Sequence, residues 1–438
     1  MRQRLAVLAC AAAVWAAAAP AHAQVIRTRP FPGLFGSGDP EKSVTQVDFL
    51  SFLSGGHETT TSSLADGALG SSTSDNTFGN LVFRGRMAHQ GRRSVFSTDG
   101  RATTSYYDRR GGMSPFNFSA GARFTTAVGR HGTLALRQTA FYSPFYVFSA
   151  VDADTETDTD PPPAADDDSD SVDPRLDQRA ARLSTKGYTT VGAYSFGVGK
   201  SGTFFSSYRF SYIDSAPGVF DLMSNLPNVG YRHRVSRFGR LTASYGLRAY
   251  KYVNSPYGQL LSHDLVFGYG YDRPLSAWRR TTAGFNVSTA LVDGGGFTRA
   301  HLNATARLHR RFGRTWVVGL NYTRGQQVLD GFTVPFFAFS DAVRGSFTGR
   351  VVRDITWSGR LGYSHSHYTL DALESSFDTM SASTRVQVPV MWALSLYVEG
   401  FYNQHDFQRR LGLLDGIPTS LERTGVRAGL TVNVPVYR

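Results

Sequence analysis

Cysteine is almost absent from the chain of 438 residues, which has only Cys10, close to the N-terminus. A single cysteine forms no intramolecular disulfide and supplies no multi-thiolate metal site, so disulfide-stabilised and zinc-finger classes are excluded. Long apolar runs are lacking as well. No stretch reaches the roughly 20 apolar residues that a membrane-spanning helix requires. The sequence therefore excludes the helical membrane proteins.

The N-terminus has the pattern of a secretory signal peptide. Arg2 and Arg4 are basic, residues 5–19 are apolar and rich in alanine, and residues 21–23 form a small-residue cleavage motif. We predict that residues 1–23 are a signal peptide removed during export, and that residues 24–42 form an N-terminal periplasmic segment. The protein is then expected to leave the cytoplasm of a Gram-negative-type bacterium.

The rest of the chain repeats one pattern of strands and turns. Glycine, at 45 residues, and aromatic residues, at 13%, are spread evenly without a linker between compact regions, which favours a single repetitive architecture. Short turn motifs containing glycine or proline alternate with longer polar segments. Between them apolar and polar residues alternate with a period of two, as they do in residues 425–437. The pattern predicts an all-β fold, a single transmembrane antiparallel β-barrel of about 16–18 strands over residues 43–438.

The tryptophans and arginines support this barrel. The four tryptophans after residue 23 follow short turns on the apolar phase, which predicts a girdle at one membrane interface: Trp278, Trp316, Trp357 and Trp392. Arginines within the strands fall on the polar phase. Because an arginine facing lipid at the bilayer midplane costs about 2–4 kcal/mol, we expect them to line the lumen and bind solute. The predicted lumen arginines are Arg84, Arg86, Arg123, Arg209, Arg248, Arg307, Arg344, Arg350, Arg360 and Arg427.

Acidic residues are concentrated in one segment. Eleven of the 34 aspartates and glutamates lie between positions 152 and 177, in a chain whose net charge is +12. Such a composition is typical of disorder. We predict that residues 149–187 form an acidic, disordered extracellular loop; whether it gates the pore or binds divalent cations stays open.

The final strand carries a further signal. Arg427, Gly429, Val432 and Val434 follow the order polar, glycine, apolar, apolar. This order resembles the C-terminal assembly signal of bacterial outer-membrane β-barrels of the porin-like superfamily, although Tyr437 is penultimate here and the chain ends with Arg438. The resemblance covers residues 43–438 and implies an outer-membrane location, with outer-membrane lipid, lipopolysaccharide and the barrel-assembly machinery as partners. A weaker resemblance links the chain to alginate-exporter-like barrels.

Motifs for other chemistry are weak. Residues 197–201 are similar to the end of a phosphate-binding loop, but Tyr194 stands where the first glycine belongs, so we interpret them as a turn. His365 and His367 could share one face of a strand and are interpreted as a surface pair. The sequence has no nucleophile elbow. We therefore expect no enzyme activity, no cofactor, no metal site and no nucleic acid partner.

The sequence thus favours passage of hydrophilic solutes. A barrel of 16–18 strands is wide enough for an aqueous channel, and inward arginines favour small anionic solutes. Two alternatives stay open. The barrel could export an anionic exopolysaccharide, or it could be a structural or adhesive outer-membrane protein. The solute and the formation of a homo-oligomer are not determined by the sequence.

Overall fold

A computed structural model provides the fold. The chain divides into two units, Met1–Gly36 and Ser37–Arg438, and all described residues belong to the second unit. The described residues are 44–63, 72–108, 112–113, 116–144, 146–147, 179–181, 184–215, 221–253, 259–274, 281–294, 297–313, 315–328, 337–352, 354–370, 373–407 and 419–437. The predicted signal peptide 1–23 and segment 24–42 lie outside them. Within the described part, no helix has the length and apolar character needed to cross a membrane.

Within these ranges, 18 long strands form one closed antiparallel barrel, at the upper end of the predicted count. The long strands are β1 (Val44–Ser63), β2 (Ser72–Gln90), β3 (Ser94–Tyr107), β5 (Asn117–Val128), β6 (Gly132–Ser143), β9 (Thr185–Val198), β10 (Gly202–Ser215), β11 (Asp221–Arg234), β12 (Gly239–Val253), β13 (Gln259–Pro274), β14 (Thr281–Gly294), β15 (Phe297–Phe312), β16 (Trp316–Val328), β17 (Phe337–Val352), β18 (Ile355–Leu370), β19 (Leu373–Pro389), β20 (Leu394–Phe407) and β21 (Ser420–Tyr437). The predicted fold class is confirmed.

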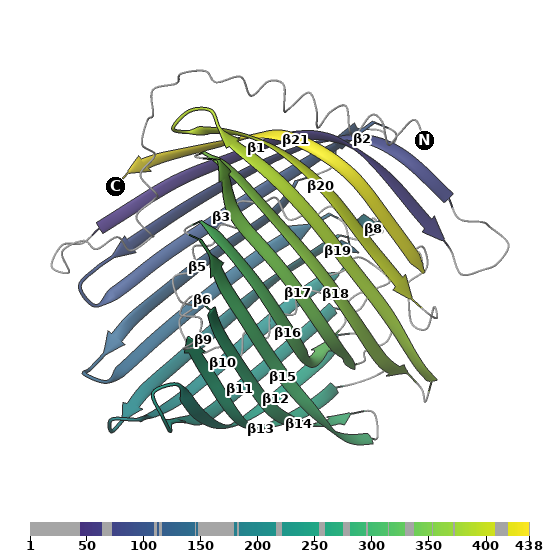
Figure 1. The fold of residues 1–438 in the computed structure, drawn as a ribbon. Helices are drawn as coiled ribbons and strands as arrows, with labels where there is room; N and C mark the ends of the chain where they lie inside the picture. The colour runs from purple at the N-terminus through teal and green to yellow at the C-terminus, as the bar shows by residue number, and fades with distance from the viewer. Residues whose placement is uncertain are drawn as a thin grey trace. The chain divides into compact units, whose positions relative to one another are not determined.

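The ring closes between the ends of the chain. Each long strand pairs with its neighbours in sequence, and β1 pairs antiparallel with β21 from Val47–Tyr437 to Ser63–Ser420 (Figure 1). Closure gives every long strand two neighbours, so the described sheet has no free edge and the backbone groups of its strands pair with one another.

Short turns join the strands at one end of the barrel, which we call the short-turn end. Gly129, Gly199 and Gly313 in these turns adopt φ values of 67°, 65° and 57°. A left-handed residue matches the twist of a tight hairpin, and glycine adopts it without a steric penalty from Cβ. Of the residues 197–201 interpreted as a turn, 199–201 link β9 to β10, whereas Gly197 and Val198 are the last residues of β9.

Strand pairing extends beyond the predicted boundaries in two places. The sequence of Asp272–Pro274, with its proline, is typical of a turn. In the structure these three residues are the last of β13 and pair with β14. Within the predicted loop 149–187, β8 (Arg179–Ala181) pairs with β7 (Tyr146–Val147), and β9 already begins at Thr185. Backbone hydrogen bonds between strands do not require alternating apolar residues. Strand pairing therefore continues into polar segments, where the alternation of apolar and polar residues does not indicate a strand. The acidic residues 152–177 lie outside the described part.

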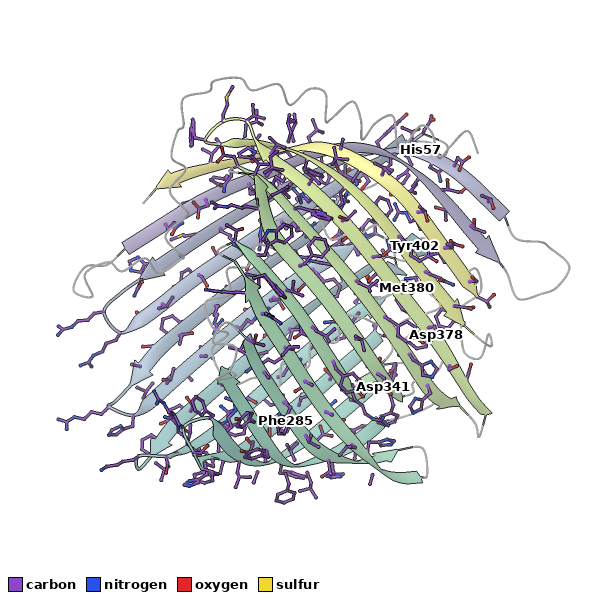
Figure 2. The ribbon with its side chains drawn as sticks, in the orientation of Figure 1. His57, Phe285, Asp341, Asp378, Met380 and Tyr402 are labelled. Atoms are coloured by element: carbon purple, nitrogen blue, oxygen red, sulfur yellow. The ribbon has the colours of Figure 1, made fainter. Side chains whose placement is uncertain are left out.

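The two faces of the strands differ as the alternation predicts. Large apolar side chains on the outer face are exposed, from Leu53 at 55% to Phe267 at 69%. Side chains of the alternate phase, which point inward, are mostly polar and more buried, and Arg423 and Arg427 on β21 are fully covered. Figure 2 shows the side chains on the ribbon, with Phe285 and Met380 among the labelled outward residues.

Candidate functional site

The candidate site is the inner face of the barrel, where the strand register places all ten predicted lumen arginines. Their side chains differ in exposure. Arg307, Arg350 and Arg360 are exposed, whereas Arg427 is only 1% exposed. The remaining six are intermediate: Arg84, Arg86, Arg123, Arg209, Arg248 and Arg344. Inward placement is therefore observed, and their role in binding solute stays a prediction.

A row of three charged side chains crosses β19, β20 and β21, and we call it the glutamate row. Glu399 faces Arg385 on one side and Arg427 on the other in the strand register. The Arg427 Nη2 atom donates a hydrogen bond of 2.9 Å to Glu399 Oε1, and the two side chains are 1% and 2% exposed. Gly56 stands opposite Arg427 on β1, where an added Cβ would lie 2.9 Å from the Arg427 Cβ. Glycine at this position leaves room for the guanidinium chain.

Aromatic rings support the glutamate row. The guanidinium of Arg385 lies 3.9 Å from the centroid of Tyr397, and that of Arg427 lies 5.7 Å from the centroid of Phe401. Cations over aromatic faces are stabilised by the ring quadrupole, more so when water is excluded. The row is thus an integrated part of the packed interior.

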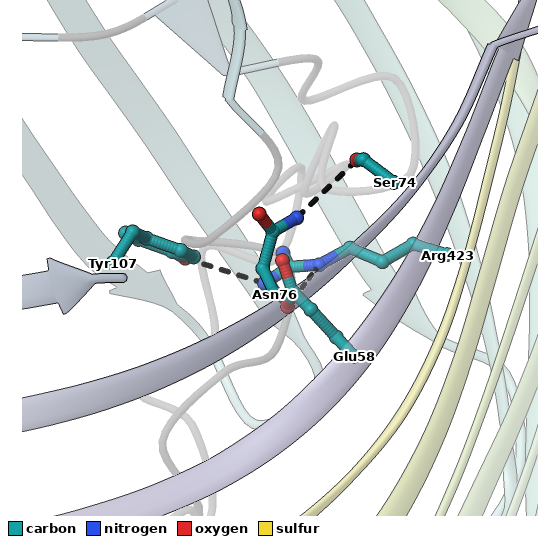
Figure 3. A network of polar contacts seen from close by, with 5 residues as sticks. All are labelled: Glu58, Ser74, Asn76, Tyr107 and Arg423. Atoms are coloured by element: carbon teal, nitrogen blue, oxygen red, sulfur yellow. Dashed lines mark hydrogen bonds and ion pairs between the residues drawn. The ribbon is translucent and has the colours of Figure 1, made fainter. Parts of the chain in front are cut away.

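A second buried network joins the first and last strands (Figure 3). The Arg423 guanidinium on β21 pairs with Glu58 on β1, with its Nε atom 2.7 Å from Glu58 Oε2. The Nη2 atom of Arg423 also donates to Tyr107 Oη at 3.3 Å. Next to this pair, Asn76 Nδ2 donates to Ser74 Oγ at 3.3 Å. We call Glu58, Arg423 and Tyr107 the closure network, because they connect the two strands that close the ring.

The inner face of β14–β18 has a different composition. Arg307 on β15 and Arg344 on β17 flank Asn321 on β16 in the register, and we call these three residues the asparagine row. Arg360 faces Ser346 and Ser383. Among the described inward positions of β14–β18 with defined side chains, none is an aspartate or glutamate. The described inward residues of this wall therefore contribute positive charge and no carboxylate of their own.

Elsewhere on the inner face carboxylates accompany the arginines. Asp264 on β13 forms an ion pair with Arg248 on β12. Asp48 and Asp99 flank Arg86 in the register of β1, β2 and β3. These acids, like Glu58 and Glu399, were not predicted as site residues. Their position on the polar phase of each strand indicates that they face inward, but only the strand register shows which arginine each one faces.

The described tryptophans gather at the short-turn end. Trp316 begins β16, and its ring centroid lies 6.0 Å from that of Trp357 in an edge-on arrangement. Trp357 also contacts Phe347 at 5.1 Å between centroids. Trp392 is 65% exposed in the turn between β19 and β20. Trp278 lies outside the described residues, and the membrane role of the girdle stays a prediction.

At the other end, outward tyrosines pair with carboxylates. Tyr322 donates to Asp341 at 2.6 Å and Tyr363 to Asp378 at 2.7 Å. His365 Nδ1 also lies 2.9 Å from Asp378 Oδ1, so the outward His365 has an acidic partner that the sequence did not reveal. The described part of the chain contains no group of three or more His, Cys, Asp or Glu residues suited to a metal ion.

Comparisons with known proteins identify similar solved structures only. No protein-family model matches the sequence, and no curated protein matches it. OpdQ from Pseudomonas aeruginosa has 9% identity and a TM-score of 0.43, over 90% of this chain and 98% of that one. OccAB3 from Acinetobacter baumannii also has 9% identity and a TM-score of 0.43, over 89% and 99%. OccK2 (OpdF) from Pseudomonas aeruginosa, in complex with glucuronate, has 10% identity and a TM-score of 0.43, over 89% and 98%.

Proposed function

We propose that this protein is an outer-membrane channel through which small anionic, hydrophilic solutes diffuse passively. The observation that carries the proposal is the inner wall of β14–β18, where Arg307, Arg344, Arg350 and Arg360 face the interior of a closed barrel and their described register neighbours are Gly, Asn, Ser or Thr. A barrel with this number of strands is wide enough to leave an aqueous passage.

The membrane location follows from the outer face. Exposed apolar side chains encircle the barrel, from Phe49 on β1 through Leu241 and Leu320 to Val426 on β21. Soluble proteins rarely expose contiguous apolar patches larger than a few hundred Å², and a continuous apolar belt on a closed antiparallel barrel suits the hydrocarbon layer of a bilayer. Bacterial barrels of this type lie in the outer membrane.

The charge of the inner wall supports the proposed preference for anions. Guanidinium groups carry a fixed positive charge and hold carboxylates or phosphates with paired hydrogen bonds. Rings of such groups favour anions in pores. The exposed side chains of Arg350 and Arg360 are accessible to a passing solute.

Planar-bilayer electrophysiology tests the proposal. The parent protein should conduct and should show a reversal potential that favours anions in a salt gradient. Replacing Arg344, Arg350 and Arg360 together by glutamine should shift the reversal potential toward cations, most strongly at low ionic strength, because the Debye length is about 3 Å at 1 M salt and longer in dilute salt.

A matched control removes the same number of charges from the outer face: Lys186→Gln, Lys251→Gln and Arg324→Gln. All three side chains are exposed and point outward. The control should retain the parent reversal potential. A folded protein without conductance contradicts the channel, and an inner triple variant with unchanged selectivity contradicts the anion preference.

A further inference from the structure

The outer surface at the short-turn end combines positive charge with apolar side chains. Exposed basic side chains stand in its turns at Arg92, Arg130, Lys200 and Arg237. Among the described residues of the short turns at this end, the acidic one is Asp354, between β17 and β18. We call this surface the basic rim.

The opposite end carries both signs of charge among its described outward residues. Its carboxylates Asp214, Asp341 and Asp378 are engaged by Lys186 and by tyrosine hydroxyls at 2.6–2.9 Å, and Lys251 and Arg324 are exposed at the same end. A ligand drawn to the basic rim by charge must be anionic.

Apolar side chains are also exposed in the turns of this end. Val235 at 56% shares its turn with Arg237, and Met391 at 62% lies in the turn between β19 and β20. The guanidinium of Arg310 lies 4.5 Å from the ring centroid of Phe312, an outward aromatic residue at the end of β15. Apolar side chains at the short-turn end suit the boundary between the acyl chains and the headgroups of a bilayer. Long basic side chains at this boundary can reach the headgroups. A water-soluble anion would engage the charges and leave the apolar groups in water.

We propose that the basic rim binds the headgroups of anionic phospholipids in the adjacent leaflet. This inference rests on the proposed membrane location and goes beyond the channel function, since the rim lies outside the pore lining. Each headgroup phosphate would accept hydrogen bonds from rim guanidinium groups, and its acyl chains would pack against the exposed turn residues.

Lipid retention measured by native mass spectrometry tests the proposal on the full-length folded protein. The protein is equilibrated in mixed micelles with equal amounts of phosphatidylglycerol and phosphatidylcholine. The parent should retain more phosphatidylglycerol. The rim variant Arg92→Gln, Arg130→Gln and Arg237→Gln should lower this enrichment about fivefold or more, because each basic residue near an anionic surface contributes to attraction.

The matched control is the outer-face variant Lys186→Gln, Lys251→Gln and Arg324→Gln at the opposite end, which should keep the parent enrichment. Raising the salt concentration should reduce the enrichment of the parent, since exposed charges are screened. Equal retention of the two lipids by the parent overturns the proposal, as does a rim variant that enriches phosphatidylglycerol as the parent does. Conductance of the same samples reports on the channel separately, so a conducting protein without lipid preference refutes only the lipid site.

Discussion

The glutamate row and the asparagine row each have one arginine on either side of a central residue. The central residue is Glu399 in the first row and Asn321 in the second. With Glu399 at the centre, the flanking guanidinium groups are buried beneath aromatic rings. With Asn321 at the centre, Arg307 is exposed and Arg344 is intermediate. A carboxylate at the centre offsets the charge of the arginines and allows them to pack, whereas the amide of Asn321 adds no negative charge to its row. Arginine on the inner face therefore has two roles, and the strand neighbour decides between them.

The largest expected effect comes from removing the central charge of the glutamate row. Glu399→Gln leaves the buried guanidinium of Arg427 without its counter-charge, so we expect the free energy of unfolding to fall by about 3–5 kcal/mol. Denaturant unfolding of the protein folded in lipid vesicles measures this change.

Asn321→Gln, at the centre of the asparagine row, is the matched control and should stay within about 0.5 kcal/mol of the parent. A Glu399→Gln variant as stable as this control would show that the charge of Glu399 does not support the packed wall.

The converse change introduces a carboxylate into the asparagine row. Asn321→Glu should place a negative charge between Arg307 and Arg344 and move the reversal potential away from anion selectivity. Because this wall is partly exposed, its stability should change by only about 0–1 kcal/mol. Bilayer recordings in a salt gradient provide the measurement.

Gln404→Glu adds the same charge on the outward phase of β20 and should leave the selectivity unchanged. If Asn321→Glu also leaves it unchanged, the asparagine row does not face the conducting path.

The smallest effect concerns the closure network. Tyr107→Phe removes the hydroxyl that accepts a hydrogen bond from Arg423 but keeps the ring that stacks 6.1 Å from Phe78. We expect a loss of about 1 kcal/mol in the free energy of unfolding. Tyr106→Phe is the control, because Tyr106 is the adjacent outward residue and is 50% exposed. An equal effect of the two substitutions would show that the contact with Arg423 contributes nothing measurable.

Much of the fold could be predicted because a barrel has strong local signals. Alternation with a period of two separates the faces of a strand without knowledge of its neighbours, so Arg344 and Arg360 are placed on the inner face correctly from the sequence. A turn was predictable where glycine adopts a left-handed conformation, as at Gly199. The ends of the strands were less predictable, because the pairing of Asp272–Pro274 depends on the backbone and not on polarity.

The partners of the inner-face arginines could not be predicted from the sequence. Glu58 and Arg423 are 365 positions apart, and only the register between β1 and β21 brings them together. The same holds for His365 and Asp378, which face each other across β18 and β19. A register shift of one residue would reverse the faces of a strand, so cross-strand contacts require the assembled ring.

The pairing of β1 with β21 also constrains how the barrel is made. β21 follows every other described strand in the sequence, so the edge of β1 that it covers stays unpaired until β21 has been synthesised. An exposed edge is a template for pairing with other chains, and contacts of such long sequence separation form slowly. We therefore expect the joining of β1 to β21 to be a slow step of assembly, during which this edge is open to pairing with other chains.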